Sequence, residues 1–461
     1  MNYSIAEVNN IVQGKLLNIT DAQAARLFVS GIDFDSRQIQ AGDLFLPIAD
    51  HDNVSVHNLF ADYTIAEKDG HNFIQAAMQK GAVASLADHE IATELPLILV
   101  SDTQLALWRL AQDYLQGINP KTIAVTGSNG KTTTKDLIAS LLSMKFQVHK
   151  THASYNNEIG VPMTILKMPA ATQVLVIEMG MDRPGQLTAL SKLVNEDIAV
   201  ITMIGEAHIA FFKTRAKIAD AKMEITAGLK ENGVFIYNGD EPLLRERSHA
   251  INSRKLTFGE QEGNSFQVTD IQEDARLIFK VNQQRHAVQL LGKFNADNCA
   301  AAIAVAKEFS FSDELIQKGF DHLELTADRL QQLVGSKGET IISDVYNSNP
   351  TAALKALDIL KDFPANGKKI LVLGDMLELG KREVDLHLLL KDPLEHDAFD
   401  RVYLVGTVMK HLADQIEAQW YPSDSLNELI IDLQSYLSEN DVVLLKASHG
   451  IHLEKVERAL I

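Results

Sequence analysis

Cysteine is almost absent from this sequence, with Cys299 the only one among 461 residues. A single thiol excludes a disulfide framework and any metal site built from several cysteines. Cys299 lies in the segment Asn298-Cys299-Ala300-Ala301-Ala302, an apolar setting typical of a helix. A free cysteine in such surroundings behaves as a small hydrophobic residue, so we expect Cys299 to be an inert part of the core.

Long apolar runs and a targeting signal are also missing. No run approaches the ~20 apolar residues that a membrane span needs. Residues 1–7 lack the basic segment followed by an apolar one that marks a secretory signal. We therefore expect a cytoplasmic protein that does not insert into a membrane.

Positive charge is in deficit. The chain has 43 Lys and Arg against 61 Asp and Glu, a net charge of −18 with histidine neutral. This balance argues against a general nucleic-acid-binding protein. An anionic substrate would have to be held by local donors and metal ions, because the overall field repels it.

The length predicts about three domains. Internal repeats and low-complexity tracts are missing, and apolar strand-like runs alternate with helix-like segments, which predicts an α/β fold with parallel sheets. We place the domains at residues 1–118, 119–325 and 326–461, with a linker near Gly117-Ile118-Asn119-Pro120. The first would be a small α/β domain, the second a phosphate-loop domain with a mostly parallel sheet, and the third a Rossmann-like doubly wound domain.

The expected strands fall in the second and third domains. In the third domain they predict a sheet of dinucleotide-binding type, but the motif Gly-x-Gly-x-x-Gly is missing there, so a bound dinucleotide is not indicated. The strand candidates are residues 122–126, 174–179, 198–204 and 234–237 in the second domain and 340–345, 370–373, 402–405 and 442–445 in the third.

The most informative motif is a glycine-bearing segment between an apolar run and a helix-like pattern. In a phosphate loop, backbone N–H groups at a helix start hold the phosphates, a lysine reaches the terminal phosphates, and a hydroxyl can hold Mg²⁺. The general pattern wants glycine where this chain has Val125; its glycine is instead Gly127. A turn without a ligand is the alternative, but the strand-to-helix position favours a phosphate loop. The nucleotide-binding candidates are Gly127, Ser128, Asn129, Gly130, Lys131, Thr132 and Thr133.

Two polar residues follow expected strands. Glu178 comes directly after the apolar run 174–177, and His208 follows the run 198–204 within Gly205-Glu206-Ala207-His208. Ligands bind at the carboxyl ends of parallel strands. Either residue alone is more often a surface or capping group, but two potential ligands beside a nucleotide loop favour a functional site.

Lys222 occupies an unusual position in the helix-like segment 217–229. It lies four residues after Ile218, on the face that carries the apolar residues. From the residues alone, the favoured interpretation is a long stem that carries its charge outward, because a buried ammonium costs free energy and cannot bind a metal.

Taken together, these motifs resemble the Mur ligases of peptidoglycan synthesis, nearly from end to end. The first domain is similar to the family's UDP-binding domain, and the second to its ATPase domain. Two third-domain motifs point to the branch that adds D-alanyl-D-alanine rather than to its sister ligases: Tyr346-Asn347-Ser348-Asn349-Pro350 and Leu373-Gly374-Asp375-Met376-Leu377-Glu378-Leu379-Gly380. The other matching segments are 35–37, 42–45, 69–73, 126–134, 156–162, 178–180, 205–208 and 221–225.

The resemblance changes the interpretation of Lys222. In this family the matching lysine is carbamylated, which replaces the ammonium by an oxygen ligand of the kind Mg²⁺ prefers. The family pattern implies one Mg²⁺ at Thr132 and Glu178, and a second among Glu178, His208 and the carbamate of Lys222. Lys131, Glu178, His208 and Lys222 are accordingly the catalytic candidates.

The resemblance also implies contacts to the substrates. The matching positions for ATP are Asn295 and Asn298 at the adenine, with Arg329 and Asp344 as closing contacts from the linker and third domain. Ser36 and Arg37 match UDP-sugar positions, and Asn156 and Asn157 lie at the loop that faces the muramoyl group. The remaining substrate-binding candidates are Tyr346, Asn347, Asn349 and Ser448.

Three positions depart from the family pattern. Phe294 replaces a common histidine before the first adenine-site asparagine, and Asp328 stands where glycine is common before Arg329. His449 replaces a common arginine, so any contact with an anionic group there would be weaker and dependent on pH. None of these changes removes a metal or phosphate ligand.

The expected activity is ATP-dependent joining of D-Ala-D-Ala to UDP-MurNAc-tripeptide through an acyl phosphate, by a monomer that requires Mg²⁺. Two alternatives within the superfamily are the sister ligase that adds the third residue and a folylpolyglutamate synthase. An alternative of another class is a phosphate-loop NTPase switch. The tripeptide's third residue, lysine or diaminopimelate, is not determined by these motifs.

Overall fold

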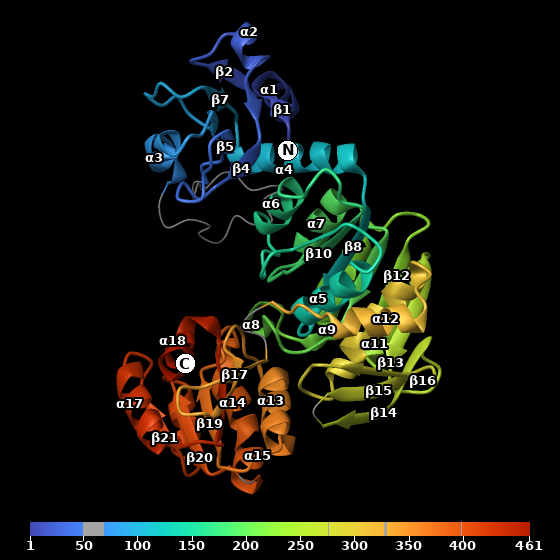
Figure 1. Cartoon of the computed structure of the whole chain (residues 1–461), viewed down its shortest axis with the longest axis vertical. Coiled ribbons are helices and arrows are strands. Elements are labelled where there is room, and N and C mark those ends of the chain that lie inside the picture. The colour runs from blue at the N-terminus through green and yellow to red at the C-terminus, as the bar shows by residue number, and fades with distance from the viewer. Residues whose placement is uncertain (49–68, 275, 327–329, 398) are drawn as a thin grey trace.

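Three α/β units follow one another along the long axis of the molecule (Figure 1). The computed structural model describes residues 1–48, 69–274, 276–326, 330–397 and 399–461. Its sheets are mixed but mostly parallel, which confirms the predicted fold class. The domain boundaries at 118 and 325 stay predictions. None of the described helices combines the length and the apolar character that crossing a bilayer would take.

The first unit contains a five-stranded sheet of order β2-β7-β6-β5-β4 and a strand pair, β1-β3. Strands β4 to β7 are parallel to their neighbours, and β2 is antiparallel to β7. Its strands are β1 (Tyr3–Ser4), β2 (Lys15–Leu17), β3 (Phe28–Val29), β4 (Gly31–Asp33), β5 (Asp43–Phe45), β6 (Ala84–Ala87) and β7 (Leu97–Leu99), and its helices are α1 (Ile5–Val12), α2 (Asp21–Ala24), η2 (Gly70–Phe73) and α3 (Ile74–Gln79).

Helix α4 (Thr103–Ile118) joins the first unit to the second. Asp102 caps its start by accepting hydrogen bonds from the N–H groups of Gln104 and Leu105. Along its length α4 packs against α1 and against α6 (Gly160–Leu166) of the central unit. Two side chains of α4 also bond the central unit, since Trp108 Nε1 donates to the Glu158 carbonyl at 2.8 Å and Tyr114 Oη to the Met168 carbonyl at 2.7 Å. The two units therefore share one continuous apolar core.

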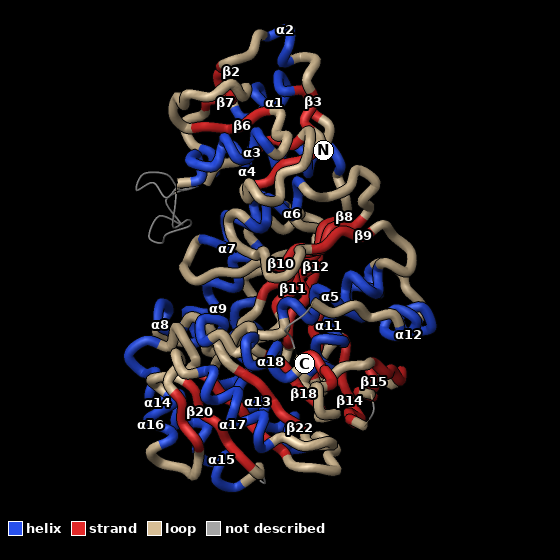
Figure 2. Tube along the Cα trace, turned by 60° about the vertical axis from the view of Figure 1, so that its left-hand side comes forward, coloured by secondary structure: helices blue, strands red, loops and turns tan. Residues whose placement is uncertain are grey.

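The central sheet has nine strands in the order β16-β15-β14-β13-β12-β11-β8-β10-β9. Both faces of its parallel part are covered: in Figure 2 its strands lie between α7 on one side and α5 and α11 on the other. Alternate residues of β8 accordingly enter different cores, Ile123 on the α5 side and Ala124 on the α4 side. This explains the near-continuous apolar runs of these strands.

The predicted central strands are present with small shifts at their ends, whereas the antiparallel hairpin β14–β16 had no strand prediction. Its alternating polar residues leave one face open to solvent, which weakens the apolar signal. The strands are β8 (Lys121–Thr126), β9 (Val148–Lys150), β10 (Val174–Glu178), β11 (Ile198–Ile201), β12 (Val234–Asn238), β13 (Arg254–Gly259), β14 (Phe266–Glu273), β15 (Leu277–Val281) and β16 (Gln284–Val288). The other helices are α5 (Lys131–Leu142), α7 (Gln186–Val194), α8 (Ile209–Phe212), α9 (Arg215–Met223), η3 (Glu224–Thr226), α10 (Pro242–Ser248), α11 (Asn295–Glu308) and α12 (Asp313–Asp321).

The third unit has a six-stranded sheet of order β17-β18-β22-β19-β20-β21, parallel except for β17 at one edge. All four strands predicted here are observed, and the apolar residues of both faces are buried in separate cores. The strands are β17 (Gln331–Val334), β18 (Thr340–Asp344), β19 (Lys369–Gly374), β20 (Arg401–Val405), β21 (Gln419–Tyr421) and β22 (Val442–Lys446). The helices are α13 (Pro350–Asp362), η4 (Gly380–Arg382), α14 (Glu383–His387), η5 (Leu388–Leu390), α15 (Lys391–His396), α16 (Met409–Ala413), α17 (Leu426–Tyr436), η6 (His449–Ile451) and α18 (Glu454–Leu460).

Candidate active site

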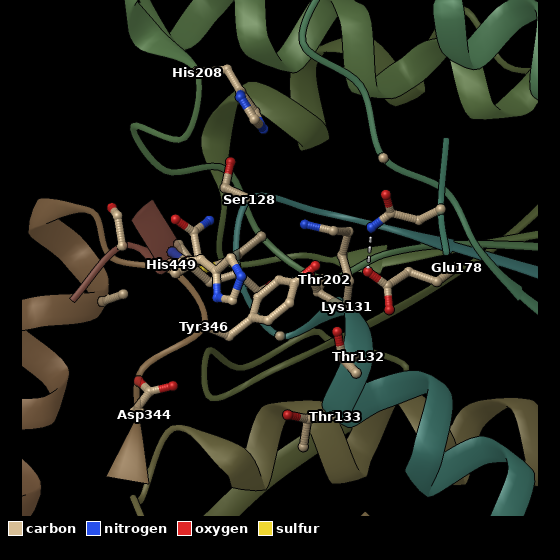
Figure 3. Close-up of a pocket in the computed structure, with 18 of the residues that line it drawn as sticks. Ser128, Lys131, Thr132, Thr133, Glu178, Thr202, His208, Asp344, Tyr346 and His449 are labelled. Carbon is tan, nitrogen blue, oxygen red and sulfur yellow. Dashed lines mark hydrogen bonds between the residues drawn. The ribbon is translucent and has the colours of Figure 1, made fainter. Parts of the chain in front are cut away.

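A cavity of about 520 Å³ lies where the carboxyl ends of central strands face those of the third unit. In Figure 3, Lys131 and Thr132 at the start of α5 and Glu178 at the end of β10 lie across the cavity from Asp344, Tyr346 and His449. Strand carboxyl ends are where α/β sheets bind ligands. Most of the predicted site residues line this cavity: Ser128, Asn129, Gly130, Lys131, Thr132, Thr133, Asn156, Asn157, Glu178, His208, Asn298, Asp344, Tyr346, Asn347 and Ser448.

The predicted phosphate loop is a tight turn between β8 and α5. Thr202, from the neighbouring strand segment, donates its hydroxyl to the Asn129 carbonyl at 2.6 Å, and the Ser128 N–H donates to the Met203 carbonyl at 2.9 Å. Lys131 folds back on the loop, with Nζ 3.0 Å from the Gly127 carbonyl oxygen. The first residues of α5, Lys131 to Thr133, line the cavity. A helix start of this kind attracts an anion.

Gly130 is the loop position where glycine is required. Its φ is +81°, and an added Cβ would lie 2.6 Å from Asn298 Oδ1. We predict that Gly130→Ala raises KM for ATP about ten-fold, because left-handed strain of about 1–3 kcal/mol displaces the loop. Steady-state kinetics with varied ATP measures this. Gly117→Ala, in α4 with open space around the site of its Cβ, is the matched control and should leave KM unchanged. An unaltered KM in Gly130→Ala would show that the loop does not hold the nucleotide.

Glu178 is a completely buried carboxylate at the cavity. Its Oε1 accepts a hydrogen bond from Asn156 Nδ2 at 2.7 Å, and its backbone N–H donates to Thr151 Oγ1 at 3.0 Å. The second oxygen, Oε2, is buried without a hydrogen-bond partner among the described residues. A buried charged oxygen without a partner is costly, and it fits a site for a cation.

His208 and Lys222 lie on separate elements of the central unit. His208 precedes α8 in a left-handed conformation, with Nδ1 2.6 Å from Glu378 Oε2 of the third unit. Lys222, on α9, is only 2% exposed, so it is buried on the inward face and does not carry its charge outward. Burial lowers the pKa of Lys222 well below its usual value, and the ammonium of Lys131 lowers it further. Lys222 is not among the side chains that line the cavity.

The two adenine-site asparagines are engaged with the protein itself. Asn298 Nδ2 donates to Asn295 Oδ1 at 2.7 Å, and Asn295 Nδ2 donates to the Leu291 carbonyl at 2.7 Å. Asn298 Oδ1 accepts from the Thr134 hydroxyl beneath the phosphate loop. Asn298 reaches the cavity, whereas Asn295 is buried outside its lining. Asn298 therefore supports the helix start that follows the phosphate loop, and Asn295 holds Asn298 in place.

Asp297 and Lys355 line the cavity beside these asparagines, and neither was predicted. Burial, followed by the charges of Glu260 and Asp240, raises the pKa of Asp297 to about 7. Lys355 Nζ lies 4.6 Å from the centre of the Phe294 ring, a cation–π distance. Phe294, which stands where the family commonly has histidine, therefore brings an aromatic ring to this end of the cavity. Lys355 of the third unit lies over the face of that ring.

The third unit contributes a second charged pair. Lys446, at the end of β22, lies 2.5 Å from Asp344 Oδ2 at the end of β18, and it also donates to the Asn347 carbonyl at 3.0 Å. Lys446 had not been identified as a site residue, although its position after the apolar run 442–445 is the same strand-end signal that identified Glu178. Ser448 Oγ accepts from the Leu377 N–H at 2.9 Å, and Tyr346 and His449 are ring neighbours at 5.9 Å.

Direct contacts join the third unit to the phosphate-loop side. Asn129 and Asn349 exchange hydrogen bonds between their side-chain amides, at 3.3 and 2.8 Å. Thr351 donates its hydroxyl to Glu206 Oε2 at 2.5 Å. Asn349 also caps α13, so its amide pair fixes the start of that helix against the loop.

Some predicted residues lie elsewhere. Ser36 and Arg37 are in the loop after β4 of the first unit, outside the cavity, and the Arg37 guanidinium binds Asp35 at 2.8 Å. Gly127 and Asn349 adjoin the cavity lining without belonging to it. Arg329 and Asp328 lie outside the described residues. Cys299 is completely buried in α11, as expected.

Comparisons with known proteins agree with this architecture. Residues 125–306 match the Mur ligase middle domain, and residues 328–449 match the family described as Mur ligase, glutamate ligase domain. The UDP-N-acetylmuramoyl-tripeptide–D-alanyl-D-alanine ligase of Bacillus subtilis is 36% identical, over 99% of this chain and 98% of that protein.

Two solved structures have the same fold over nearly the whole chain. MurF from Acinetobacter baumannii superposes with a TM-score of 0.84 at 27% identity, covering 99% of this chain and 98% of the other. MurF from Thermotoga maritima, solved in complex with ADP, gives a TM-score of 0.78 at 29% identity, covering 93% of this chain and 96% of the other. With polar strand-end residues around a phosphate loop and a relative 36% identical along its length, this chain belongs to the Mur ligase family, in its MurF branch.

Proposed function

We propose that this chain is an ATP-dependent ligase that joins D-alanyl-D-alanine to UDP-MurNAc-tripeptide, yielding UDP-MurNAc-pentapeptide for peptidoglycan. The observation that carries the proposal is the cavity between two units. One wall holds the phosphate loop and the buried Glu178 carboxylate, one oxygen of which has no hydrogen-bond partner among the described residues. The other wall holds strand-end residues of the third unit. Such a cavity can bring a nucleotide and two further substrates together.

ATP would bind with its phosphates against the loop 127–133 and the start of α5. Lys131 would leave the Gly127 carbonyl, which it contacts in this structure, and reach the transferring phosphoryl group. The other end of the nucleotide would face Asn298, Asp297 and the Phe294 ring. Asp344 is assigned to the nucleotide as well, together with Arg329. The substrates' remaining contacts are assigned to Ser36, Arg37, Asn156, Asn157, Tyr346, Asn347, Asn349 and Ser448.

Mg²⁺ fits the residues of this site. Within the part of the chain that the structure describes, Glu178 Oε2 is a buried carboxylate oxygen without a hydrogen-bond partner, and the Thr132 side chain lies at the same wall. His208 would bind through Nε2, since Nδ1 faces the Glu378 carboxylate, an arrangement that fixes the ring of metal-binding histidines. Bound there, Mg²⁺ supplies positive charge that stabilises the transferring phosphoryl group.

Lys222 would complete the metal set as a carbamate. Burial lowers the pKa of Lys222, which favours the neutral amine, the form that attacks CO₂. The N–C bond forms as the amine loses a proton, and the product is an anionic oxygen ligand suited to Mg²⁺. The inward position that disfavours an ammonium is thereby explained.

The reaction would proceed in two displacements. A terminal carboxylate oxygen of the tripeptide attacks the γ-phosphorus of ATP, ADP leaves, and an acyl phosphate forms. The amine of D-Ala-D-Ala then attacks the acyl carbon, phosphate leaves, and the nitrogen loses a proton. Lys131 would stabilise the negative charge on the transferring phosphoryl group. The N–H groups of the loop would hold the neighbouring phosphates of ATP.

The remaining features of the proposal concern the whole chain. The cavity is built within one chain, which supports a monomer as the active form. Because UDP-sugar and ATP are the proposed substrates, we place the protein in the cytoplasm. The functional domains would be residues 1–118 for the UDP-sugar, 119–325 for ATP, and 326–461 for closure over both.

A phosphate-release assay with each substrate omitted in turn tests the activity. We expect release to rise at least about ten-fold over ATP alone only when UDP-MurNAc-tripeptide and D-Ala-D-Ala are both present, because the acyl phosphate forms and turns over on bound substrates. Lysine- and diaminopimelate-containing tripeptides are compared to define the third residue. Release with ATP alone would support an NTPase switch, and use of a free amino acid with a dipeptide nucleotide would support the sister ligase.

A further inference from the structure

Three charged side chains, two of them buried, form a cluster at the back of the phosphate-loop helix. Lys135 and Asp136 occupy the second turn of α5 and are at most 1% exposed, and Lys150 ends β9. Asp136 Oδ1 lies 2.6 Å from Lys150 Nζ and 3.4 Å from Lys135 Nζ. We call these three residues the α5 charge cluster. Neither the phosphate loop nor the candidate metal ligands include them.

The cluster holds the chain segment that leads into the third unit. Asp136 Oδ2 accepts a hydrogen bond from the Thr326 N–H at 2.8 Å, and Lys135 Nζ donates to the Thr326 hydroxyl at 3.3 Å. Lys150 Nζ donates to the Glu324 carbonyl at 3.3 Å. Thr326 is the last described residue before 327–329, and β17 of the third unit begins at Gln331. Hydrogen bonds from all three residues of the cluster therefore hold the end of the linker, at Glu324 and Thr326, against α5 and β9.

The same cluster holds the segment that positions Glu178. Lys135 Nζ donates to the Thr151 and Ala153 carbonyls at 2.9 and 3.1 Å. Thr151 in turn accepts the backbone N–H of Glu178 on its hydroxyl. Three residues after Ala153, Asn156 donates to Glu178 Oε1. One ammonium therefore links the start of the loop 151–157 with the linker.

Lys135 uses all three of its N–H donors on acceptors from these two segments. Burial lowers the pKa of Lys135, whereas the carboxylates of Asp136 and Glu178 raise it. A buried ion pair contributes little net stability compared with apolar packing. The directional hydrogen bonds of Lys135 nevertheless favour one arrangement of α5, the loop 151–157 and the linker.

We propose that Lys135 and Asp136 are positioning residues that set the linker, and with it the third unit, in register with the phosphate loop and Glu178. The anchor of the linker consists of Glu324 and Thr326, which the α5 charge cluster holds against α5 and β9. The inference rests on the proposed ligase function for its activity readout. It concerns how the position of the third unit depends on the central unit. The metal and nucleotide contacts proposed above do not include these residues.

Asp136→Asn is the informative variant. An amide can accept from the lysines with its oxygen, but its Nδ2 then faces the Thr326 N–H, so two donors oppose each other. Asp197→Asn is the matched control. Asp197 also lies between two lysines, Lys121 at 2.9 Å and Lys230 at 2.8 Å, and accepts a backbone N–H from Thr122 at 3.0 Å. It lies at the amino-terminal edge of the same sheet, away from the linker.

The experiment measures three quantities on the full chain: the dissociation constant of a non-hydrolysable ATP analogue, kcat for ligation, and compaction on ligand binding by small-angle X-ray scattering. For Asp136→Asn we expect kcat to fall at least about ten-fold and the compaction to shrink, with the analogue's dissociation constant changed less than about three-fold. Asp197→Asn should keep wild-type kcat and compaction. Lys150→Met, with a partly exposed side chain, should repeat the effect more weakly if Asp136→Asn does not fold.

Wild-type kcat and compaction in both Asp136→Asn and Lys150→Met would overturn the inference. So would an equal loss of kcat in Asp197→Asn at matched melting temperature, because the effect would then be general destabilisation. If the wild-type chain compacts with ATP analogue and tripeptide nucleotide but does not use D-Ala-D-Ala, the proposed function fails. The coupling is still tested in that case, since the compaction readout needs no ligation.

Discussion

Lys222→Ala is expected to lower the rate of ligation by roughly 10²–10³-fold, the size of loss seen when one preorganised group that stabilises transition-state charge is removed. The lysine is buried and its pKa is lowered by burial. Among the described residues it forms no ion pair with a carboxylate, so its truncation breaks none. The proposed loss is that of one anionic metal ligand. Ligation is measured by coupled ADP release with all three substrates present.

Two further measurements separate this loss from damage to the fold. Lys217→Ala changes the same residue type on the exposed face of the same helix and should keep full activity. A small carboxylate added to Lys222→Ala should restore part of the rate by occupying the vacated space. In the wild type, ¹³C-labelled bicarbonate should give a carbamate resonance that the variant lacks. Full activity of unrescued Lys222→Ala would refute the carbamate.

Glu178→Gln is expected to lower kcat by about 10²–10³-fold at fixed Mg²⁺ and to raise the Mg²⁺ concentration needed for half-maximal rate. Loss of a metal ligand's charge removes several kcal/mol of stabilisation, at 1.36 kcal/mol per factor of ten. The amide oxygen can still accept from Asn156, so the local hydrogen bond is retained. The measurement is a Mg²⁺ titration of the rate.

Glu196→Gln is the matched control for this change. Glu196 is also completely buried, and one of its oxygens has no hydrogen-bond partner among the described residues, but it does not line the cavity. Burial raises the pKa of Glu196 to about 8, so it is mostly protonated at pH 7 and a neutral amide resembles it. Its Mg²⁺ dependence should equal that of the wild type. The same Mg²⁺ titration curve for Glu178→Gln and wild type would remove Glu178 from the metal site.

Residues of the central site could be predicted from the sequence where a polar residue directly follows an apolar run that is typical of a buried strand. Glu178 follows four apolar residues, and its place at the carboxyl edge of the sheet was predictable from that pattern alone. Lys222 was different. Helical periodicity placed it on the inward face, but the cost of burying an ammonium favoured the wrong orientation of its charge until the family resemblance supplied a reason for burial.

Features that depend on contacts between distant segments were not predictable. The Asn129–Asn349 amide pair joins residues 220 positions apart; each asparagine belongs to a predicted site motif, but no local pattern predicts that the two bond to each other. The hairpin β14–β16 was missed because its solvent-facing polar residues dilute the apolar signal. The α5 charge cluster was missed for a related reason: a lysine and an aspartate side by side on a helix ordinarily indicate a solvated face.

The core shared through α4 has a consequence for how the molecule can come apart. Because α4 contributes buried side chains to both the first and the central unit, neither unit can unfold without stripping apolar contacts from the other. Heat or denaturant should therefore act on these two units as a single cooperative block. The third unit has its own pair of cores and meets that block through polar contacts and through Ile209, Leu291 and Phe294, which pack against one of those cores. A substitution inside the second of the third unit's cores should therefore lower the stability of that unit more than the stability of the block.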